Sequence, residues 1–162
     1  MNKRMLAEGV FWVGAIDWDR RLFDSLIPLP DGTSYNSYLI KGSERTALID
    51  TVDPTMTEVL KEHLNQVEVK NIDYVIANHA EQDHSGSLPH ILERHPEAKV
   101  VCTPRCKEFL IELLRIPEGK FITVNDKETL SLGNRTLEFI HAPWVHWPET
   151  MLTYLREDKI LF

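Results

Sequence analysis

The sequence has 162 residues, of which 43% are hydrophobic and 27% are charged, and its net charge is −7. These values are typical of a soluble globular domain. A chain of about 150 residues buries roughly 70% of the surface that its unfolded form exposes, so one domain with its own core is expected. No apolar run approaches the ~20 residues that span a bilayer, and no signal sequence opens the chain. We therefore expect a cytoplasmic protein without a membrane partner.

Charge and cysteine content disfavour two further classes of protein. The excess of acidic residues works against binding to the phosphates of nucleic acids, so no nucleic-acid partner is expected. Cys102 and Cys106 are too few for a disulfide scaffold, and their C-x3-C spacing is neither a redox C-x-x-C motif nor a zinc motif. They are predicted to be reduced, partly buried thiols.

The first third of the chain is rich in residues that favour strands. We expect strands at Val10–Asp17, Ser34–Ile40 and Thr46–Asp50, which lie next to one another and run antiparallel. Asp53-Pro54 then marks the start of a helix, because Asp caps helix N-termini and Pro fits the first turn. This helix is predicted to run from Pro54 to about Gln66, with apolar residues at helical spacing.

The remainder of the chain alternates strands with helices. The expected elements are a strand at Tyr74–Ala77, a helix through Leu88, Ile91 and Leu92, a strand at Lys99–Cys102, a helix at Pro104–Leu114, a strand at Phe121–Val124, a hairpin of Thr129–Leu132 with Thr136–His141, and a hairpin of Met151–Leu155 with Lys159–Phe162. A β-meander followed by such alternation predicts a layered α/β protein with a mixed sheet.

The polar loop Asn78–Gly86 follows the apolar strand and contains four residues that can bind metal: His79, Glu81, Asp83 and His84. In an extended segment, side chains at i and i+2 face the same way, so His79, Glu81 and Asp83 can converge, and a turn at Asp83 lets His84 join them. The alternative is a solvated loop in which Asp83 caps the following helix. The density of ligands favours metal binding. Because Asp83 and His84 must diverge from the other pair, a two-metal site is expected.

Two segments carry a resemblance to a known family. Val75–Gly86 resembles the strand-and-loop signature of the metallo-β-lactamase superfamily, whose hydrolytic members carry H-x-H-x-D-H. Here Glu81 replaces the second histidine, and H-x-E-x-D-H is the variant of the flavodiiron proteins. Ala142–Met151 resembles the W-x-H-W-P-[DE]-x-M segment of the same family. Two separate motifs at family-like spacing make the resemblance specific.

The resemblance implies a role for each matching residue. His79, Glu81 and His146 would hold one iron, and Asp83 and His84 would contribute to the second. A hard carboxylate at position 81 favours Fe(II) or Mn(II) over zinc, although zinc or manganese can substitute for iron. Trp144 and Trp147, which flank His146, are expected to close an apolar wall over the metals.

The resemblance also implies a metallo-β-lactamase-like αββα sandwich, of which residues 1–162 form the N-terminal part as an incomplete diiron domain. Flavodiiron proteins continue with a bridging aspartate, a further histidine and a flavodoxin-like domain that binds FMN. The chain is therefore expected to be a fragment, or to be completed by a separate polypeptide. FMN is expected in the complete protein and not on this segment alone.

The activity that the resemblance implies is the reduction of O2 to water, of NO to N2O, or of both. Electrons would pass from rubredoxin or a flavin reductase through FMN, in a homodimer. Two alternatives remain open. One is a metal-dependent hydrolase of the same superfamily, which Glu81 disfavours, and the other is a non-catalytic module that binds iron or oxygen without turnover.

Overall fold

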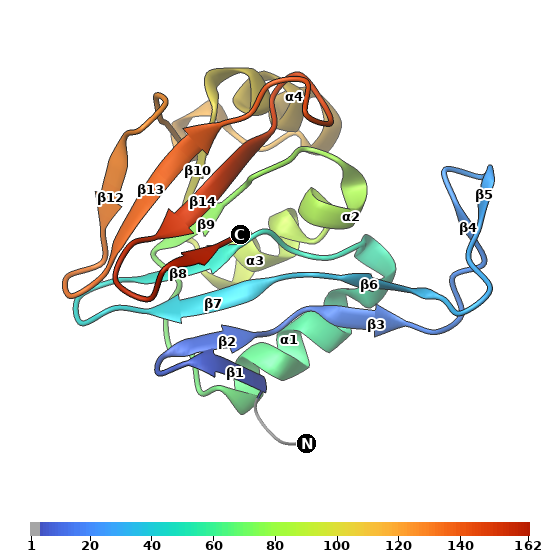
Figure 1. The fold of residues 1–162 in the computed structure, drawn as a ribbon, viewed down its shortest axis with the longest axis horizontal. Helices are drawn as coiled ribbons and strands as arrows, with labels where there is room; N and C mark the ends of the chain where they lie inside the picture. Colours follow the sequence, from blue (N-terminus) through green and yellow to red (C-terminus); the bar gives the residue numbers. More distant parts are fainter. Residues whose placement is uncertain (1–3) are drawn as a thin grey trace.

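A seven-stranded sheet forms the centre of the computed structural model, which describes residues 4–162 (Figure 1). Its strands, in spatial order, are β1 (Arg4–Ala7), β2 (Val10–Trp12), β7 (Tyr38–Lys41), β8 (Thr46–Ile49), β9 (Tyr74–Ile76), β10 (Lys99–Cys102) and β11 (Phe121–Thr123). Neighbouring strands from β1 to β8 are antiparallel, whereas those from β8 to β11 are parallel. The prediction of a mixed sheet is therefore confirmed.

A second, antiparallel sheet packs on one face of the first. It consists of β12 (Thr129–Ser131), β13 (Thr136–His141), β14 (Met151–Leu155) and β15 (Ile160–Leu161), so both predicted hairpins are confirmed. Alternation along the strands turns one side chain in two toward the facing sheet. The core between the sheets joins Ile40, Ile49 and Val101 to Phe139 and Met151.

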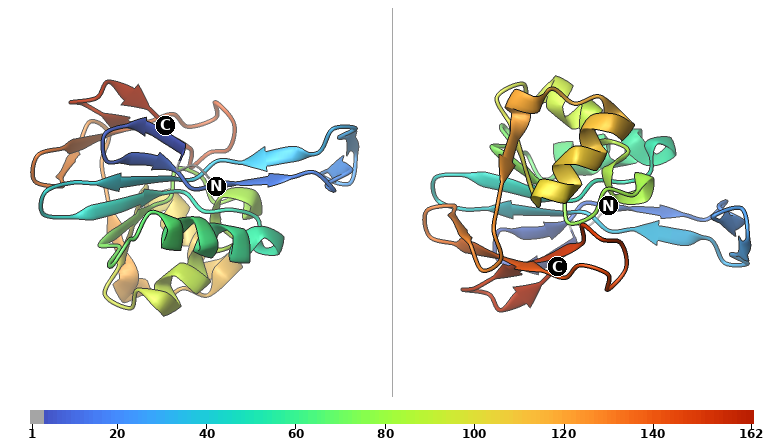
Figure 2. Two further views of the ribbon diagram at one scale, coloured as in Figure 1. Left: turned by 90° about the horizontal axis from the view of Figure 1, so that it is seen from below. Right: turned by 90° about the horizontal axis from the view of Figure 1, so that it is seen from above.

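Helices cover the other face of the large sheet (Figure 2). They are η1 (Pro54–Met56), α1 (Thr57–Gln66), α2 (Gln82–Ser85), α3 (Leu88–Arg94), α4 (Pro104–Leu114) and η2 (Glu118–Lys120). Leu64, Ile91 and Leu110 from these helices pack on Leu48 and Val100 of the sheet. Helix, sheet and sheet are three of the four layers of the predicted αββα sandwich.

Two of the predicted strands are each divided in the structure. Residues 10–17 form β2 and β3 (Ala15–Asp17), and residues 34–40 form β6 (Thr33–Tyr35) and β7. The division lies at Gly14, where a Cβ atom would be 2.1 Å from the carbonyl oxygen of Tyr35. Beyond it, β3 and β6 project as a ribbon that ends in β4 (Leu22–Phe23) and β5 (Ile27–Pro28) (Figure 1).

Three strands were not expected from the sequence: β1, β4 and β5. Each has four residues or fewer, which is too short for an alternating pattern to stand out from a loop. Cys102 and Cys106 are free, as predicted, but they are fully rather than partly buried. Among residues 4–162, no helix has the length and apolar character needed to cross a membrane.

Candidate metal centre

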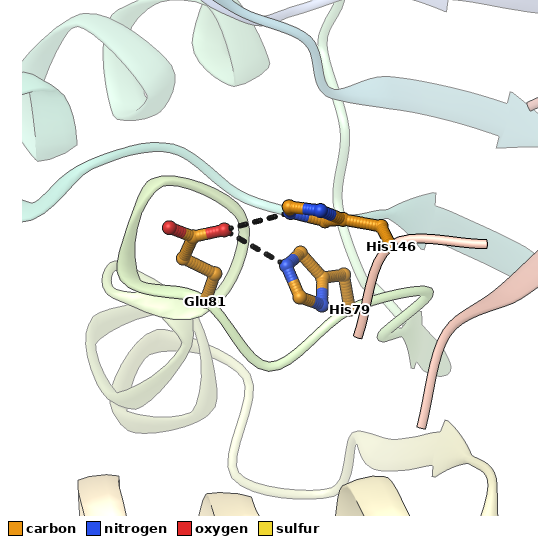
Figure 3. Close-up of side chains that lie close together, drawn as sticks. All are labelled: His79, Glu81 and His146. Carbon is orange, nitrogen blue, oxygen red and sulfur yellow. Dashed lines mark hydrogen bonds and ion pairs between the residues drawn. The ribbon is translucent and has the colours of Figure 1, made fainter. Parts of the chain in front are cut away.

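Three of the predicted ligands converge on one point (Figure 3). His79 and Glu81 lie in the loop after β9, and His146 lies in the loop between β13 and β14. The Oε2 atom of Glu81 is 2.9 Å from Nε2 of His79 and 3.1 Å from Nε2 of His146. One potential ligand atom of each residue lies within 4.8 Å of those of the other two. The loop follows a central parallel strand at its carboxyl end, which is where α/β proteins place ligands.

This donor set fits a metal ion. Two imidazole nitrogens and one carboxylate oxygen form the mixed N/O environment that Fe(II) accepts. Burial alone would raise the pKa of Glu81, but hydrogen bonds with His79 and His146 outweigh it and hold the pKa below its usual value. Glu81 is therefore anionic at neutral pH, as a metal ligand must be.

Asp83 and His84 lie beside this cluster as a second pair. The Oδ2 atom of Asp83 is 3.8 Å from Nε2 of His84, and the rings of His84 and His79 are 5.2 Å apart. The Oδ1 atom of Asp83 is buried and has no hydrogen-bond partner among the described residues. A buried carboxylate oxygen without a partner is unfavourable unless a cation occupies the space beside it. This pair therefore also fits a metal ion.

The charges around this second pair shift both pKa values. Burial raises the pKa of Asp83, and the nearby Glu81 charge adds to the shift against the lowering effect of His84. Burial would lower the pKa of His84, but the carboxylates of Asp50, Asp83 and Glu81 outweigh it and raise the pKa to about 9. The surroundings of His84 thus favour a positive charge.

The sequence-based explanation for the convergence of Asp83 with His79 and Glu81 is wrong in one respect. The backbone is extended only as far as Glu81 (φ −61°, ψ 148°), and α2 begins at Gln82. The two-residue alternation therefore relates His79 to Glu81 but does not extend to Asp83, which lies in the first turn of a helix. The alternative role of Asp83 as a helix cap is also wrong, because Ser87 is the N-cap residue of α3.

Two further carboxylates hold the histidines and were not identified from the sequence. Oε1 of Glu149 lies 2.7 Å from Nδ1 of His79 and accepts the N–H of Ala80. Oδ2 of Asp50 lies 3.1 Å from Nδ1 of His84. Glu149 lies within the second family-like segment, and Asp50 follows β8, the parallel neighbour of β9. Glu149 could therefore have been found from the family-like segment, and Asp50 from its place at the end of a predicted strand.

Trp144 and Trp147 differ in burial. The ring of Trp147 packs edge-on against His79, with 4.9 Å between the ring centres, as an apolar wall requires. Trp144 is 77% exposed and adopts a φ of 64°, so its predicted place in the wall is wrong. The reason is the tight turn in which the N–H of Trp144 donates to the carbonyl of Trp147 and turns the Trp144 side chain outward.

A cleft of about 720 Å³ opens beside the cluster. Its lining includes Glu81, Asp83 and Trp147, together with Arg20 and Tyr35 from the projecting ribbon. The cleft gives a small molecule a route from solvent to the carboxylates of the site.

Two packed sheets with a histidine–carboxylate cluster at the carboxyl end of a parallel strand define a domain of the metallo-β-lactamase type. The chain belongs to the ODP family of beta-lactamase-like domains, whose signature, described as "ODP family beta lactamase", matches residues 33–162.

Characterised relatives and solved structures extend this result. The chain is 41% identical over 165 residues to the coenzyme F420H(2) oxidase of Methanothermobacter marburgensis, which covers 98% of this chain and 40% of that protein. It is 38% identical over 156 residues to the anaerobic nitric oxide reductase flavorubredoxin of Vibrio vulnificus, covering 94% of this chain and 31% of the relative. The flavodiiron protein of Giardia intestinalis superposes with a TM-score of 0.93 and 39% identity, over 100% of this chain and 39% of that structure. The chain thus spans two fifths or less of the length of these relatives.

Proposed function

We propose that this chain is the diiron-binding part of a flavodiiron oxidoreductase that reduces O2 to water, NO to N2O, or both. The observation that carries the proposal is the convergence of His79, Glu81 and His146. Relatives that match nearly the whole chain are named an oxidase and a nitric oxide reductase, which supports a redox role. Glu81 further favours iron chemistry, because a carboxylate in place of imidazole suits Fe(II) better than zinc.

We assign the five candidate ligands to two positions. His79, Glu81 and His146 hold one iron, and Asp83 and His84 contribute to the second. The second pair is supported by the orphaned Oδ1 atom of Asp83 and by the nearby carboxylates of Asp50 and Glu81, whose negative charge favours a bound cation. Zinc or manganese is expected to occupy the same positions when iron is scarce.

Two bound ferrous ions would supply electrons and would stabilise, as Lewis acids, the charge that develops on the reduced oxygen. The side chains of this chain would position the metal and exclude water. Glu81 lies between two imidazoles and fixes the geometry of the first position. Trp147 packs against His79 and excludes water from that side, while the cleft admits a diatomic molecule.

The proposal also includes an FMN-binding domain, an electron donor and a second subunit. Residues 1–162 would act as a diiron domain, and FMN would bind a flavodoxin-like domain outside this segment. The chain spans only 31–40% of its two oxidoreductase relatives, which supports this division. Rubredoxin or a flavin reductase would donate electrons, and the complete protein would be a homodimer. A cytoplasmic location stays a prediction.

Anaerobic consumption of NO tests the proposed activity. The iron-loaded protein is mixed with NO and chemically reduced flavin, and N2O is measured. We expect loss of NO and formation of N2O that require both iron and reductant. Glu81→His should lower the rate, because it replaces the hard ligand, whereas Glu97→His, at an exposed position, should leave it unchanged.

Three other outcomes of these activity measurements would contradict the proposal. A zinc-loaded protein that hydrolyses a thioester or a phosphoester, with no consumption of NO by the iron form, would assign the chain to the hydrolases of the superfamily. An unchanged rate in Glu81→His would remove the ligand role of Glu81. Iron binding without any NO or O2 consumption would indicate a non-catalytic module.

A further inference from the structure

Glu149 is the most deeply buried carboxylate at the metal centre. Its side chain is 0% exposed, and it lies just before β14, in the loop that carries His146. The Oε1 atom is 2.7 Å from Nδ1 of His79 and 3.0 Å from the backbone nitrogen of Ala80. One oxygen thus joins a candidate ligand to the backbone of the residue that follows it.

The second oxygen of this carboxylate has no partner. Oε2 of Glu149 is buried and makes no hydrogen bond within residues 4–162. Among the described residues, this carboxylate makes its polar contacts with His79 and Ala80 and forms no ion pair with a lysine or arginine. A buried anion is costly unless a positive charge lies nearby. A cation at Nε2 of His79 would supply that charge on the opposite side of the ring.

We propose that Glu149 is a positioning residue that holds the imidazole of His79 with its proton on Nδ1 and its Nε2 lone pair toward the metal. The proposal rests on the metal-binding role proposed above. A neutral histidine carries its proton on one nitrogen, and the hydrogen bond at that nitrogen decides which atom is free to bind metal. In the metal-bound protein Nδ1–H would donate to Oε1 of Glu149. Nε2, which faces Glu81 and His146, would then be free to bind the metal.

The position of Glu149 is itself fixed by contacts from α4. The hydroxyl of Thr103 donates to the backbone carbonyl of Glu149 at 3.1 Å. The same hydroxyl oxygen caps α4 by accepting the N–H of Cys106. The N-terminus of α4, Glu149 and His79 therefore form one chain of contacts. The ring of His79 cannot rotate without breaking its contact with the carboxylate of Glu149, a residue whose backbone Thr103 fixes.

Metal affinity measures this role directly. Competition with a chromophoric chelator is performed with Zn(II) on the wild type and on Glu149→Leu, Glu149→Gln and Asp73→Asn. Glu149→Leu removes both hydrogen bonds and should weaken binding by about 10- to 100-fold. Glu149→Gln keeps an oxygen at Oε1 but loses the charge, so its affinity should lie between those of the wild type and the leucine variant. Asp73→Asn alters a carboxylate that accepts the N–H of Thr46 at the start of β8, and it should bind as the wild type does.

Nitrogen-15 NMR of the metal-free protein provides a readout that a merely structural role would not move. The wild type should show a downfield, slowly exchanging Nδ1–H resonance of His79, since this proton is buried against a carboxylate. The resonance should shift upfield in Glu149→Gln and persist in Asp73→Asn. It can be measured even if Glu149→Leu fails to fold, because Glu149→Gln retains the shape of the side chain.

Two results would overturn the proposal. One is an Nδ1–H resonance of His79 that is the same in the wild type and in Glu149→Gln. The other is a folded Glu149→Leu variant that binds Zn(II) within about threefold of the wild type, well short of the change expected for an outer-sphere partner. Failure of the wild type itself to bind Zn(II) or Fe(II) would instead contradict the proposed function, and the NMR comparison would still decide how His79 is held.

Discussion

Nε2 of His146 lies 3.1 Å from Oε2 of Glu81, although 65 residues separate the two in the sequence. The contact joins the loop after β9 to the loop between β13 and β14, and so links the two sheets at the candidate metal centre (Figure 3). The side chain of His146 is 56% exposed, so its ring is held less by burial than by this bond and by contact with the ring of His79, with 4.8 Å between the ring centres.

His146→Ala should therefore impair metal binding with little effect on folding. The first position would lose one of its three ligands, and we expect an affinity loss larger than the roughly 100-fold that outer-sphere changes cause. Anaerobic titration with Fe(II) measures the affinity. The matched control is His141→Ala, since His141 contacts the carbonyl of Val124 and lies outside the cluster. Equal affinities in the two variants would remove His146 from the ligand set.

Gly86, the last residue of the loop Asn78–Gly86, packs closely against Pro54 of η1, which leaves no space for a side chain. A Cβ atom there would be 2.4 Å from Cδ of Pro54 and 2.5 Å from the carbonyl oxygen of Gln82. Gly86→Ala should lower the free energy of unfolding by about 1–3 kcal/mol through overpacking. Gly119→Ala is the control, because nothing lies within 4 Å of its Cβ position, and it should change stability by less than about 0.5 kcal/mol. Urea unfolding of the two variants makes the comparison, and similar stabilities would contradict the packing account.

Arg135 connects three parts of the fold through one guanidinium group. It forms an ion pair with Asp158 at 2.9 Å and donates hydrogen bonds to the carbonyls of Lys41 and Glu8. Its side chain is largely buried, so Arg135→Met would leave these acceptors without a partner and should destabilise the fold by about 2–4 kcal/mol.

The control for Arg135, which precedes β13, is an exposed arginine that follows the neighbouring strand β14. Arg156 pairs with Glu138 at the surface, and Arg156→Met should cost less than about 1 kcal/mol. Thermal and urea unfolding of both variants measure the difference. A smaller effect at Arg135 than at Arg156 would show that the three contacts do not act together.

Tyr35 predicts a loss of stability at alkaline pH. Burial and the carboxylates of Asp53 and Asp17 raise the pKa of its phenol from 10.0 to about 12. The folded state therefore favours the neutral phenol. The contribution of Tyr35 to stability is complete below pH 10 and is lost as the pH rises from 10 through 12.

Tyr35→Phe isolates this effect. The variant loses the hydrogen bond to Asp17 and should be less stable than the wild type at pH 8. Its stability should nevertheless fall less steeply between pH 10 and 12 than that of the wild type. Unfolding free energies measured at several alkaline pH values give the two slopes. Parallel slopes would mean that folding does not raise the pKa of Tyr35.

Much of the fold followed from local patterns. The hairpins around β13 and β14 and the helices α1 and α4 lie where turn residues, caps and apolar periodicity placed them. The ribbon of β3 and β6 did not follow from local patterns, because the break at Gly14 depends on the close approach of the Tyr35 carbonyl. The two-residue strands β4 and β5 form only because they pair with each other.

The sequence by itself determined which potential ligands the loop Asn78–Gly86 carries. His79 and Glu81 share a face because two residues of extended backbone bring side chains to the same side, and this relation needs no other part of the protein. Tertiary structure decided the rest. Only the packing of one sheet on the other brings His146 to Glu81 and Glu149 to His79, because no local pattern fixes a distance across 65 or 70 residues.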